Sequence, residues 1–181
     1  TSTLQGILIK PFESFVFINT NEILDIQFEC SKIADIRLYI NNMETDFFYA
    51  MPYHKPIIAD QPGQFDARIE CTSGSETVIK SFRYLVGITS KTENPPAGTI
   101  PGVTNLNALS AKLALKAPGK SFVFALADIN NFLPDTNYLM KRNTAGDLVW
   151  IDLLPLKPGF NHKFQYLVDG KIIVADPLST L

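Results

Sequence analysis

The fold is decided by a short pattern near the end of the chain, Phe164-Gln165-Tyr166-Leu167-Val168-Asp169-Gly170-Lys171-Ile172. Apolar side chains alternate before the Asp-Gly pair, as they do in a strand that buries one face. Asp-Gly also suits the positive φ angles of a tight type I′ turn. The pattern therefore predicts a β-hairpin in which residues 164–168 pair directly with residues 172–175.

Similar patterns precede this hairpin in the second half of the chain. Runs rich in β-branched, aromatic and alternating residues predict further strands at residues 112–116, 121–127, 138–142 and 148–153. The turn residues between them are Pro118-Gly119, Ala145-Gly146-Asp147 and Pro158-Gly159. This half of the chain is thus expected to be a small antiparallel β-domain.

The first half of the chain shows the same organisation. Predicted strands cover residues 7–9, 14–18, 23–30, 35–40, 46–50, 56–60, 64–71 and 77–86. Asn41-Asn42, Gln61-Pro62-Gly63 and Ser73-Gly74-Ser75 supply turns. Strands spaced by about ten residues are typical of an all-β sandwich. A helical period of 3.6 is not sustained for three turns anywhere, so the expected fold class is all-β with two tandem β-sandwich domains.

A segment rich in proline and glycine separates the halves. Residues 92–102 contain three prolines and two glycines, which favour an extended connector. The expected domains are residues 1–91, an immunoglobulin-like sandwich, and residues 103–181, a second sandwich. The alternative is that residues 92–102 form a long loop within one domain.

Two cysteines lie in the first half, each at the end of an alternating strand. Cys30 shares a face with Phe28, and Cys71 shares a face with Ile69. An immunoglobulin-like arrangement of these strands would turn both sulfurs inward at one end. The pattern permits a Cys30–Cys71 disulfide, and it equally permits two buried free thiols. A disulfide would fit an oxidising, extracytoplasmic compartment.

Charge and hydropathy exclude several classes of function. The net charge is −2, divided between −4 for residues 1–94 and +2 for residues 95–181, and neither half has a basic stripe. This argues against nucleic acid as a partner. No apolar run approaches 18 residues, so no membrane span is expected. His54 and His162 lack partners at metal or triad spacing, and neither a metal site nor a cofactor is predicted.

The second half resembles a known family through several motifs in a fixed order. These are Pro118-Gly119-Lys120-Ser121-Phe122-Val123, Asp128-Ile129-Asn130-Asn131-Phe132, Tyr138-Leu139-Met140-Lys141, Pro158-Gly159, Phe164-Gln165-Tyr166-Leu167-Val168-Asp169-Gly170 and Ala175-Asp176-Pro177. Together they resemble the early-set, family-48-type carbohydrate-binding domain that precedes the catalytic barrel of secreted bacterial α-amylase-family enzymes. Residues 1–91 resemble the immunoglobulin-like domain that often precedes it, by strand spacing alone.

The resemblance implies a sugar-binding surface. Binding members of the family hold an α-glucan on two tryptophans and a lysine, because flat rings stack on the apolar faces of sugars. The matching positions here hold Phe132, Ile172 and Gln165. The carbohydrate-binding residues implied for this chain are Asn131, Phe132, Tyr138, Lys141, Trp150 and Gln165. Trp150 can alternatively be sheet packing, and Phe132 and Tyr138 can alternatively close the core.

The resemblance also implies what this chain does and does not do. The catalytic carboxylates of the amylase family lie on a (β/α)8 barrel of about 250 residues, which cannot fit in this chain. The chain is therefore expected to be a non-catalytic N-terminal region that positions a catalytic barrel of the same polypeptide and contacts starch or glycogen weakly. Its first residue, Thr1, and the break after Leu181 suggest a trimmed piece of such an enzyme. The alternative is a protein-interaction or cell-surface adhesion module that binds no glucan.

Overall fold

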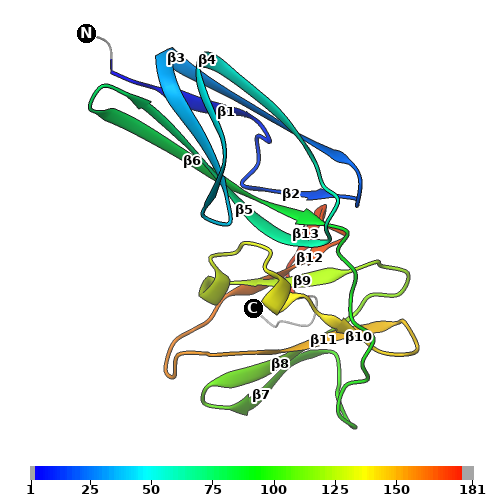
Figure 1. The fold of residues 1–181 in the computed structure, drawn as a ribbon. Coiled ribbons are helices and arrows are strands. Elements are labelled where there is room, and N and C mark those ends of the chain that lie inside the picture. The colour runs from blue at the N-terminus through cyan, green and yellow to red at the C-terminus, as the bar shows by residue number, and fades with distance from the viewer. Residues whose placement is uncertain (1–2, 177–181) are drawn as a thin grey trace. The chain divides into compact units, whose positions relative to one another are not determined.

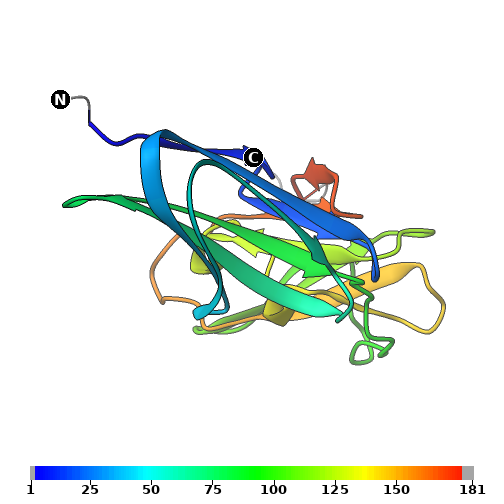
Figure 2. The same cartoon turned by 45° about the horizontal axis from the view of Figure 1, so that its top comes forward.

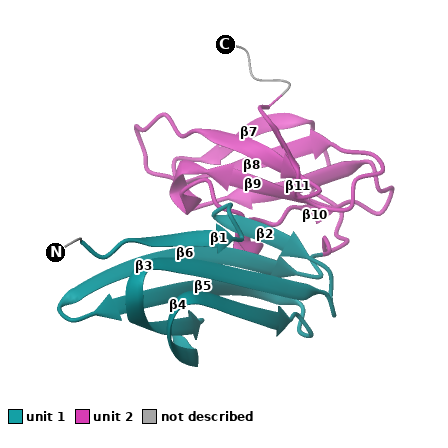
Figure 3. Cartoon of the chain, turned by 90° about the horizontal axis from the view of Figure 1, so that it is seen from above, with its two compact units in different colours: residues 1–88 teal, residues 89–181 magenta. Residues whose placement is uncertain are grey.

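The computed structural model describes residues 3–176, which form thirteen β-strands and two short 3₁₀ helices. No α-helix occurs among these residues. The chain divides into two compact units, Thr1–Ile88 (unit 1) and Thr89–Leu181 (unit 2), which Figure 3 distinguishes by colour. Each unit is a β-sandwich, and the predicted fold class is confirmed.

Unit 1 consists of six strands. They are β1 Gly6–Lys10, β2 Phe15–Ile18, β3 Ile23–Ile40, β4 Met43–Ile58, β5 Gly63–Ser73 and β6 Glu76–Val86. The predicted separation of residues 23–30 from 35–40 is wrong, as is that of 46–50 from 56–60, because each pair forms one continuous strand. Prolines 52 and 56 do not interrupt β4, which pairs with β3 alone and so lies at a sheet edge, where proline is tolerated.

The long β3–β4 ribbon links the two layers of unit 1. The first part of β3 pairs with β1, while its second part, from Asp35 onward, pairs with β5. Pairing between β3 and β4 is interrupted between Glu29 and Ala34, where the ribbon bends (Figures 1 and 2). One layer therefore contains β1 and the first part of β3. The other contains the second part of β3, then β5, β6 and β2, and β2 pairs with β6 in parallel. One folded sheet thus supplies both walls of the sandwich.

Alternation continues through the bend, so both parts of β3 face one core. Ile26, Phe28, Ile36 and Leu38 are all fully buried. The Phe28 ring packs against the neighbouring strand at Gly6 on β1, where a Cβ atom would lie 2.5 Å from the ring. Only glycine fits at this point without displacing a core ring.

A disulfide between Cys30 and Cys71 crosses this core. Cys30 lies on β3 just before the bend and Cys71 lies on β5, so the bond joins the two layers. Both residues are buried, at 7% and 0% exposure. The predicted inward orientation of the two side chains is confirmed.

The turn between β3 and β4 uses Asn41 and Asn42, which both have positive φ angles of 50° and 66°. This is the conformation of a type I′ turn, and asparagine tolerates it better than other residues with a Cβ atom. The side chain of Asn41 also accepts a hydrogen bond from the Asp66 N–H at 2.9 Å. The turn therefore fixes both the hairpin and its position against β5.

Unit 2 contains two separate sheets. The strands are β7 Gly102–Asn107, β8 Ser110–Lys116, β9 Val123–Ala127, β10 Lys141–Arg142, β11 Leu148–Leu153, β12 Phe164–Val168 and β13 Ile172–Val174. One sheet has the order β10-β11-β8-β7 and the other β13-β12-β9. Their facing sides enclose a core that includes Met140, Val149 and Tyr166.

The hairpin predicted from the Asp-Gly pair is confirmed. β12 pairs with β13, and Asp169 and Gly170 have φ angles of 51° and 68°. The Asp169 carboxylate also accepts a hydrogen bond from the Ser121 N–H at 2.7 Å. The turn thus ties the hairpin to the start of β9.

Two parts of unit 2 differ from the sequence-based expectation. β7 was not predicted, because its exposed sequence Gly-Val-Thr-Asn-Leu-Asn lacks a clear alternation, and it is a strand because β8 supplies a hydrogen-bonding partner. Residues 136–138 form a 3₁₀ helix rather than the start of a strand. The Asp135 side chain caps this helix by accepting a hydrogen bond from the Asn137 N–H at 2.8 Å.

Candidate functional site

Trp150, the only tryptophan of the chain, lies on the outer face of the β10-β11-β8-β7 sheet. Its neighbours Val149 and Ile151 face the core, so Trp150 points to the opposite side. The residues beside it in register are Lys141 on β10, Ala114 on β8 and, beyond Ala114, Gly102 on β7. Small residues on two neighbouring strands leave room for the indole to lie across the sheet.

The indole is nevertheless only 5% exposed. Its Nε1–H donates a hydrogen bond to the backbone oxygen of Glu93 at 2.8 Å. The segment around Glu93 also pairs with the sheet edge, because the Glu93 N–H donates to the Arg142 oxygen at 2.7 Å and the Arg142 N–H donates to the Lys91 oxygen at 2.8 Å. The beginning of the predicted connector 92–102 is therefore fastened to unit 2.

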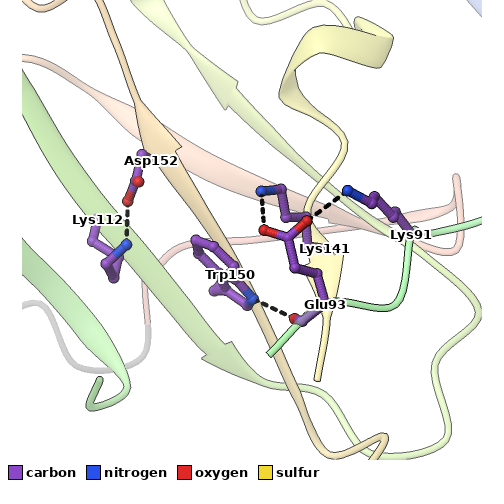
Figure 4. A network of polar contacts seen from close by, with 6 residues as sticks. All are labelled: Lys91, Glu93, Lys112, Lys141, Trp150 and Asp152. Atoms are coloured by element: carbon purple, nitrogen blue, oxygen red, sulfur yellow. Dashed lines mark hydrogen bonds and ion pairs between the residues drawn. The ribbon is translucent and has the colours of Figure 1, made fainter. Parts of the chain in front are cut away.

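Two lysines flank the indole, as Figure 4 shows. The Lys112 and Lys141 ammonium groups lie 4.5 Å and 4.6 Å from its ring centroid. This arrangement is favourable because the ring faces are electron-rich. Lys112 is only 6% exposed and forms an ion pair with Asp152, which compensates its burial.

Glu93 completes this network with two further ion pairs. Its carboxylate oxygens contact the Lys141 ammonium at 2.5 Å and the Lys91 ammonium at 2.6 Å. Hydrogen bonding to Lys141, and then to Lys91, lowers the pKa of Glu93 to about 2. Glu93 is therefore ionised at neutral pH and far into the acidic range. We call Lys91, Glu93, Lys141 and Trp150 the Trp150 clamp.

The other residues predicted to bind carbohydrate do not join this cluster. Asn131 and Phe132 are exposed and follow the 3₁₀ helix Asp128–Asn130, both with positive φ angles. Tyr138 ends the second 3₁₀ helix and packs against the core. Gln165 lies on β12, in the other sheet. Of the six predicted residues, the structure brings only Lys141 and Trp150 together.

Sequence reasoning missed Glu93 as the centre of the Trp150 clamp. Its contacts with Trp150 and Lys141 span 57 and 48 positions, so no local pattern could reveal them. It also missed the pairing of His162 with Asp128, whose two carboxylate oxygens each lie 3.1 Å from Nδ1. These partners are 34 positions apart.

Neither a metal cluster nor a membrane helix is found in the part of the chain that the structure describes. Residues 3–176 contain no group of three or more His, Cys, Asp and Glu side chains arranged to hold a metal ion. No helix among them is long and apolar enough to traverse a bilayer.

Comparisons with known proteins give fold similarities only. No family model and no curated protein matches the chain. The fibronectin(III)-like modules of Clostridium thermocellum CbhA are 20% identical over 45% of this chain and 95% of theirs, with a TM-score of 0.39. β-Glucuronidase 3 of Bacteroides uniformis is 10% identical over 97% of this chain and 25% of its own, with a TM-score of 0.37.

A pullulanase from Anoxybacillus sp. LM18-11 is 14% identical over 84% of this chain and 23% of its own, with a TM-score of 0.31. The chain thus spans about a quarter of the length of either enzyme. At these TM-scores the similarities assign neither a family nor an activity.

Proposed function

We propose that this chain is a non-catalytic accessory region of an α-glucan-processing, amylase-type enzyme, and that it acts as a spacer that positions the catalytic domain of the same polypeptide. The observation that carries the proposal is the short tether between its units. Gly87, at the end of unit 1, donates its N–H to the Ile18 oxygen at 3.0 Å. Lys91 is the first residue whose backbone is hydrogen-bonded to β10. Only residues 88–90 lie between these anchors.

Three residues span at most about 10 Å of extended chain. The Trp150 clamp keeps the tether short, because it holds Lys91 and Glu93 on unit 2 instead of leaving them to a longer linker. A spacer needs this property, since the distance over which two domains can separate grows with the length of free chain between them. Trp150, which the sequence suggested as a sugar platform, then has a structural role.

The Cys30–Cys71 disulfide supports an extracytoplasmic location, because disulfides persist in oxidising compartments. This agrees with the resemblance to secreted enzymes. The chain alone should release no reducing sugar from soluble starch, and measurable turnover would contradict the non-catalytic assignment.

Distance measurements between the units test the spacer directly. Spin labels on Lys80→Cys, exposed on β6, and Lys116→Cys, exposed on β8, would report the separation by pulsed electron resonance. The native cysteines are both in the disulfide, so the labels react only at the new sites. We expect one narrow distance distribution, which broadens in a Glu93→Ala, Trp150→Phe double variant.

Glu13→Ala, which removes an exposed carboxylate from unit 1, is the matched control and should leave the distribution unchanged. A broad distribution in the parent protein would refute the spacer. An equally narrow distribution in the double variant would show that the Trp150 clamp is irrelevant to it.

A further inference from the structure

Unit 2 contains a cavity that the Trp150 clamp and the tether do not use. It lies between the β7–β8 hairpin and the loop of residues 154–162 that follows β11, and its volume is about 330 Å³. The Leu156 N–H donates to the Leu109 oxygen at 2.7 Å, which ties the loop to the hairpin tip. Pockets that bind small ligands measure about 300–1,000 Å³, so this one is large enough for a short ligand.

The floor of this cavity is apolar and its rim carries an exposed ring. Leu113 and Leu153 line it at 1% and 2% exposure. Phe160 also lines it and is 60% exposed, although the Lys157 ammonium lies 4.0 Å from its ring centroid. A cation over one face leaves the rest of the ring accessible, and an accessible ring in a cavity is a stacking surface.

Neutral amides provide most of the polar lining. Asn105, Asn107 and Asn161 all border the cavity. Asn107 accepts a hydrogen bond from the Leu109 N–H at 2.8 Å through Oδ1. Within residues 3–176, the side-chain amides of Asn105 and Asn161 form no hydrogen bond with the protein. Each of these amides can both donate and accept.

The loop that carries Phe160 is held in place by His162. In the neutral imidazole Nε2 accepts a hydrogen bond from the Lys157 N–H at 2.8 Å, and in the protonated form it donates to the Lys157 oxygen at 3.2 Å. In both forms Nδ1 donates to the Asp128 carboxylate at 3.1 Å. The imidazole therefore connects the two ends of residues 157–162 with the start of the 3₁₀ helix Asp128–Asn130. Fixing the loop in advance lowers the entropy cost of binding at the cavity.

We propose that this cavity, with Phe160, Asn105 and Asn161, binds a neutral saccharide. Sugar hydroxyls donate and accept at once, as amides do, whereas an anion would need free cations and an apolar ligand would leave the amides unpaired. Neither positive group of the lining is free for an anion, because Lys157 lies over Phe160 and His162 is paired with the Asp128 carboxylate. The apolar floor and the ring suit the C–H faces of a sugar. This inference extends the proposed function and does not depend on the spacer.

Titration of the full chain with maltohexaose, cellohexaose and an oligogalacturonate would test the proposal by calorimetry and by ¹H–¹⁵N spectra. We expect one of the neutral oligosaccharides to bind, with shifts confined to residues 103–113 and 153–164. Phe160→Ala should weaken binding at least about tenfold, a loss of about 1.4 kcal/mol. Asn105→Ala and Asn161→Ala should each weaken it several-fold.

Phe12→Ala is the matched control, because Phe12 is an exposed aromatic residue that belongs to no proposed site. Its affinity should equal that of the parent. The absence of binding by both neutral oligosaccharides at millimolar concentration would overturn the proposal. So would loss of binding in Phe132→Ala but not in Phe160→Ala, which would favour the surface implied by the sequence. Trp150 fluorescence verifies that each variant is folded, and the inter-unit distances test the spacer separately.

Discussion

The two units hold the two layers of a sandwich together in different ways. In unit 1 the β3–β4 ribbon passes from one layer to the other, and the Cys30–Cys71 bond joins the layers covalently. In unit 2 the layers are distinct sheets, connected at one corner by the hydrogen bond from the Met140 N–H to the Val123 oxygen at 2.8 Å. Both units have packed cores, but unit 1 adds chain continuity and a covalent bond between its layers, whereas unit 2 relies mainly on packing.

The two units also differ in the lengths of their strands and loops. Long paired strands occupy most of unit 1, and its connections are tight turns. Unit 2 has shorter strands and longer loops, which carry Phe132, Phe160 and His162. Loops on a rigid framework are where binding residues usually lie. We therefore expect unit 1 to contribute stability and the loops of unit 2 to make the ligand contacts proposed above, and both expectations can be tested unit by unit.

Removal of the disulfide should have the largest effect and should affect unit 1 alone. The bond closes a loop of 41 residues, which corresponds to about 4 kcal/mol of unfolding free energy. A Cys30→Ala, Cys71→Ala variant, or the reduced parent, should lose about this much in unit 1. Hydrogen exchange of the β3 and β5 amides measures it.

Trp150 provides the internal control for that experiment, because the only tryptophan of the chain reports on unit 2. Its fluorescence transition in urea should keep its midpoint when the disulfide is removed. A transition that moves together with unit 1 would show that the units unfold as one, and the contrast between them would fail.

Truncation of a core side chain in unit 2 should have the second largest effect on the free energy of unfolding. Met140 is completely buried between the two sheets. Met140→Ala leaves a cavity that costs about 2–5 kcal/mol, and Met140→Leu should cost less than about 1.5 kcal/mol. Trp150 fluorescence in urea measures both variants. If Met140→Ala were as stable as Met140→Leu, packing would not be what joins the layers.

Local patterns in the sequence predicted most of this fold, because strands and turns depend on neighbouring residues. The Asp169-Gly170 turn and the inward-facing cysteines follow from side-chain alternation and from φ preferences. The continuity of β4 does not follow, because Pro52 is compatible with an edge strand only, and edge position is a property of the whole sheet.

The candidate sites were less predictable, because they combine distant segments. The indole of Trp150 is hydrogen-bonded to the backbone oxygen of Glu93, which lies 57 positions away. Glu93 belongs to the segment of residues 92–102, whose prolines suggest a free linker. Phe160 and Asn105 line one cavity, but Phe160 lies on a loop and Asn105 lies on a strand that alternation did not predict. An aromatic residue can be recognised in a sequence, but its exposure depends on which segments fold against it.

The pH dependence of unit 2 offers a smaller test. Hydrogen bonding to Asp128 raises the pKa of His162 above its ordinary 6.5. Burial alone would raise the pKa of Asp128, but its hydrogen bond to His162 and the charge of His162 lower it overall. Stability from His162 is complete below pH 6.5 and is lost as the pH rises through the raised value. Stability from Asp128 is present above about pH 3.8 and is lost as the pH falls through the lowered value.

The unfolding free energy of unit 2, obtained from Trp150 fluorescence in urea, should therefore decline from pH 6 to pH 9. The decline should be larger in the parent than in His162→Gln, which keeps a polar side chain but does not titrate. Asp128→Asn is the matched change at the partner and should flatten the same profile. Parallel profiles for all three proteins would show that the pair does not hold the loop.

The smallest expected effect comes from exchanging the turns of the two units. Unit 1 closes its long hairpin with Asn41-Asn42, and unit 2 closes its short hairpin with Asp169-Gly170, all four residues at positive φ. Glycine adopts this conformation without the steric cost that a Cβ atom carries. Asn42→Gly should stabilise unit 1 by about 0.5 kcal/mol, while Gly170→Asn should destabilise unit 2 by a similar amount.

Asn41 is left unchanged in this exchange, because its side chain holds the Asp66 N–H. Hydrogen exchange of β3 amides and Trp150 fluorescence read the two units separately. Opposite signs in the two units would show that each turn contributes through its own backbone conformation. Changes of the same sign would mean that the residue in the turn does not control the stability of the long hairpin of unit 1. That hairpin would then be held by its ladder of hydrogen bonds and by the disulfide, and the contrast between the units would include their turns.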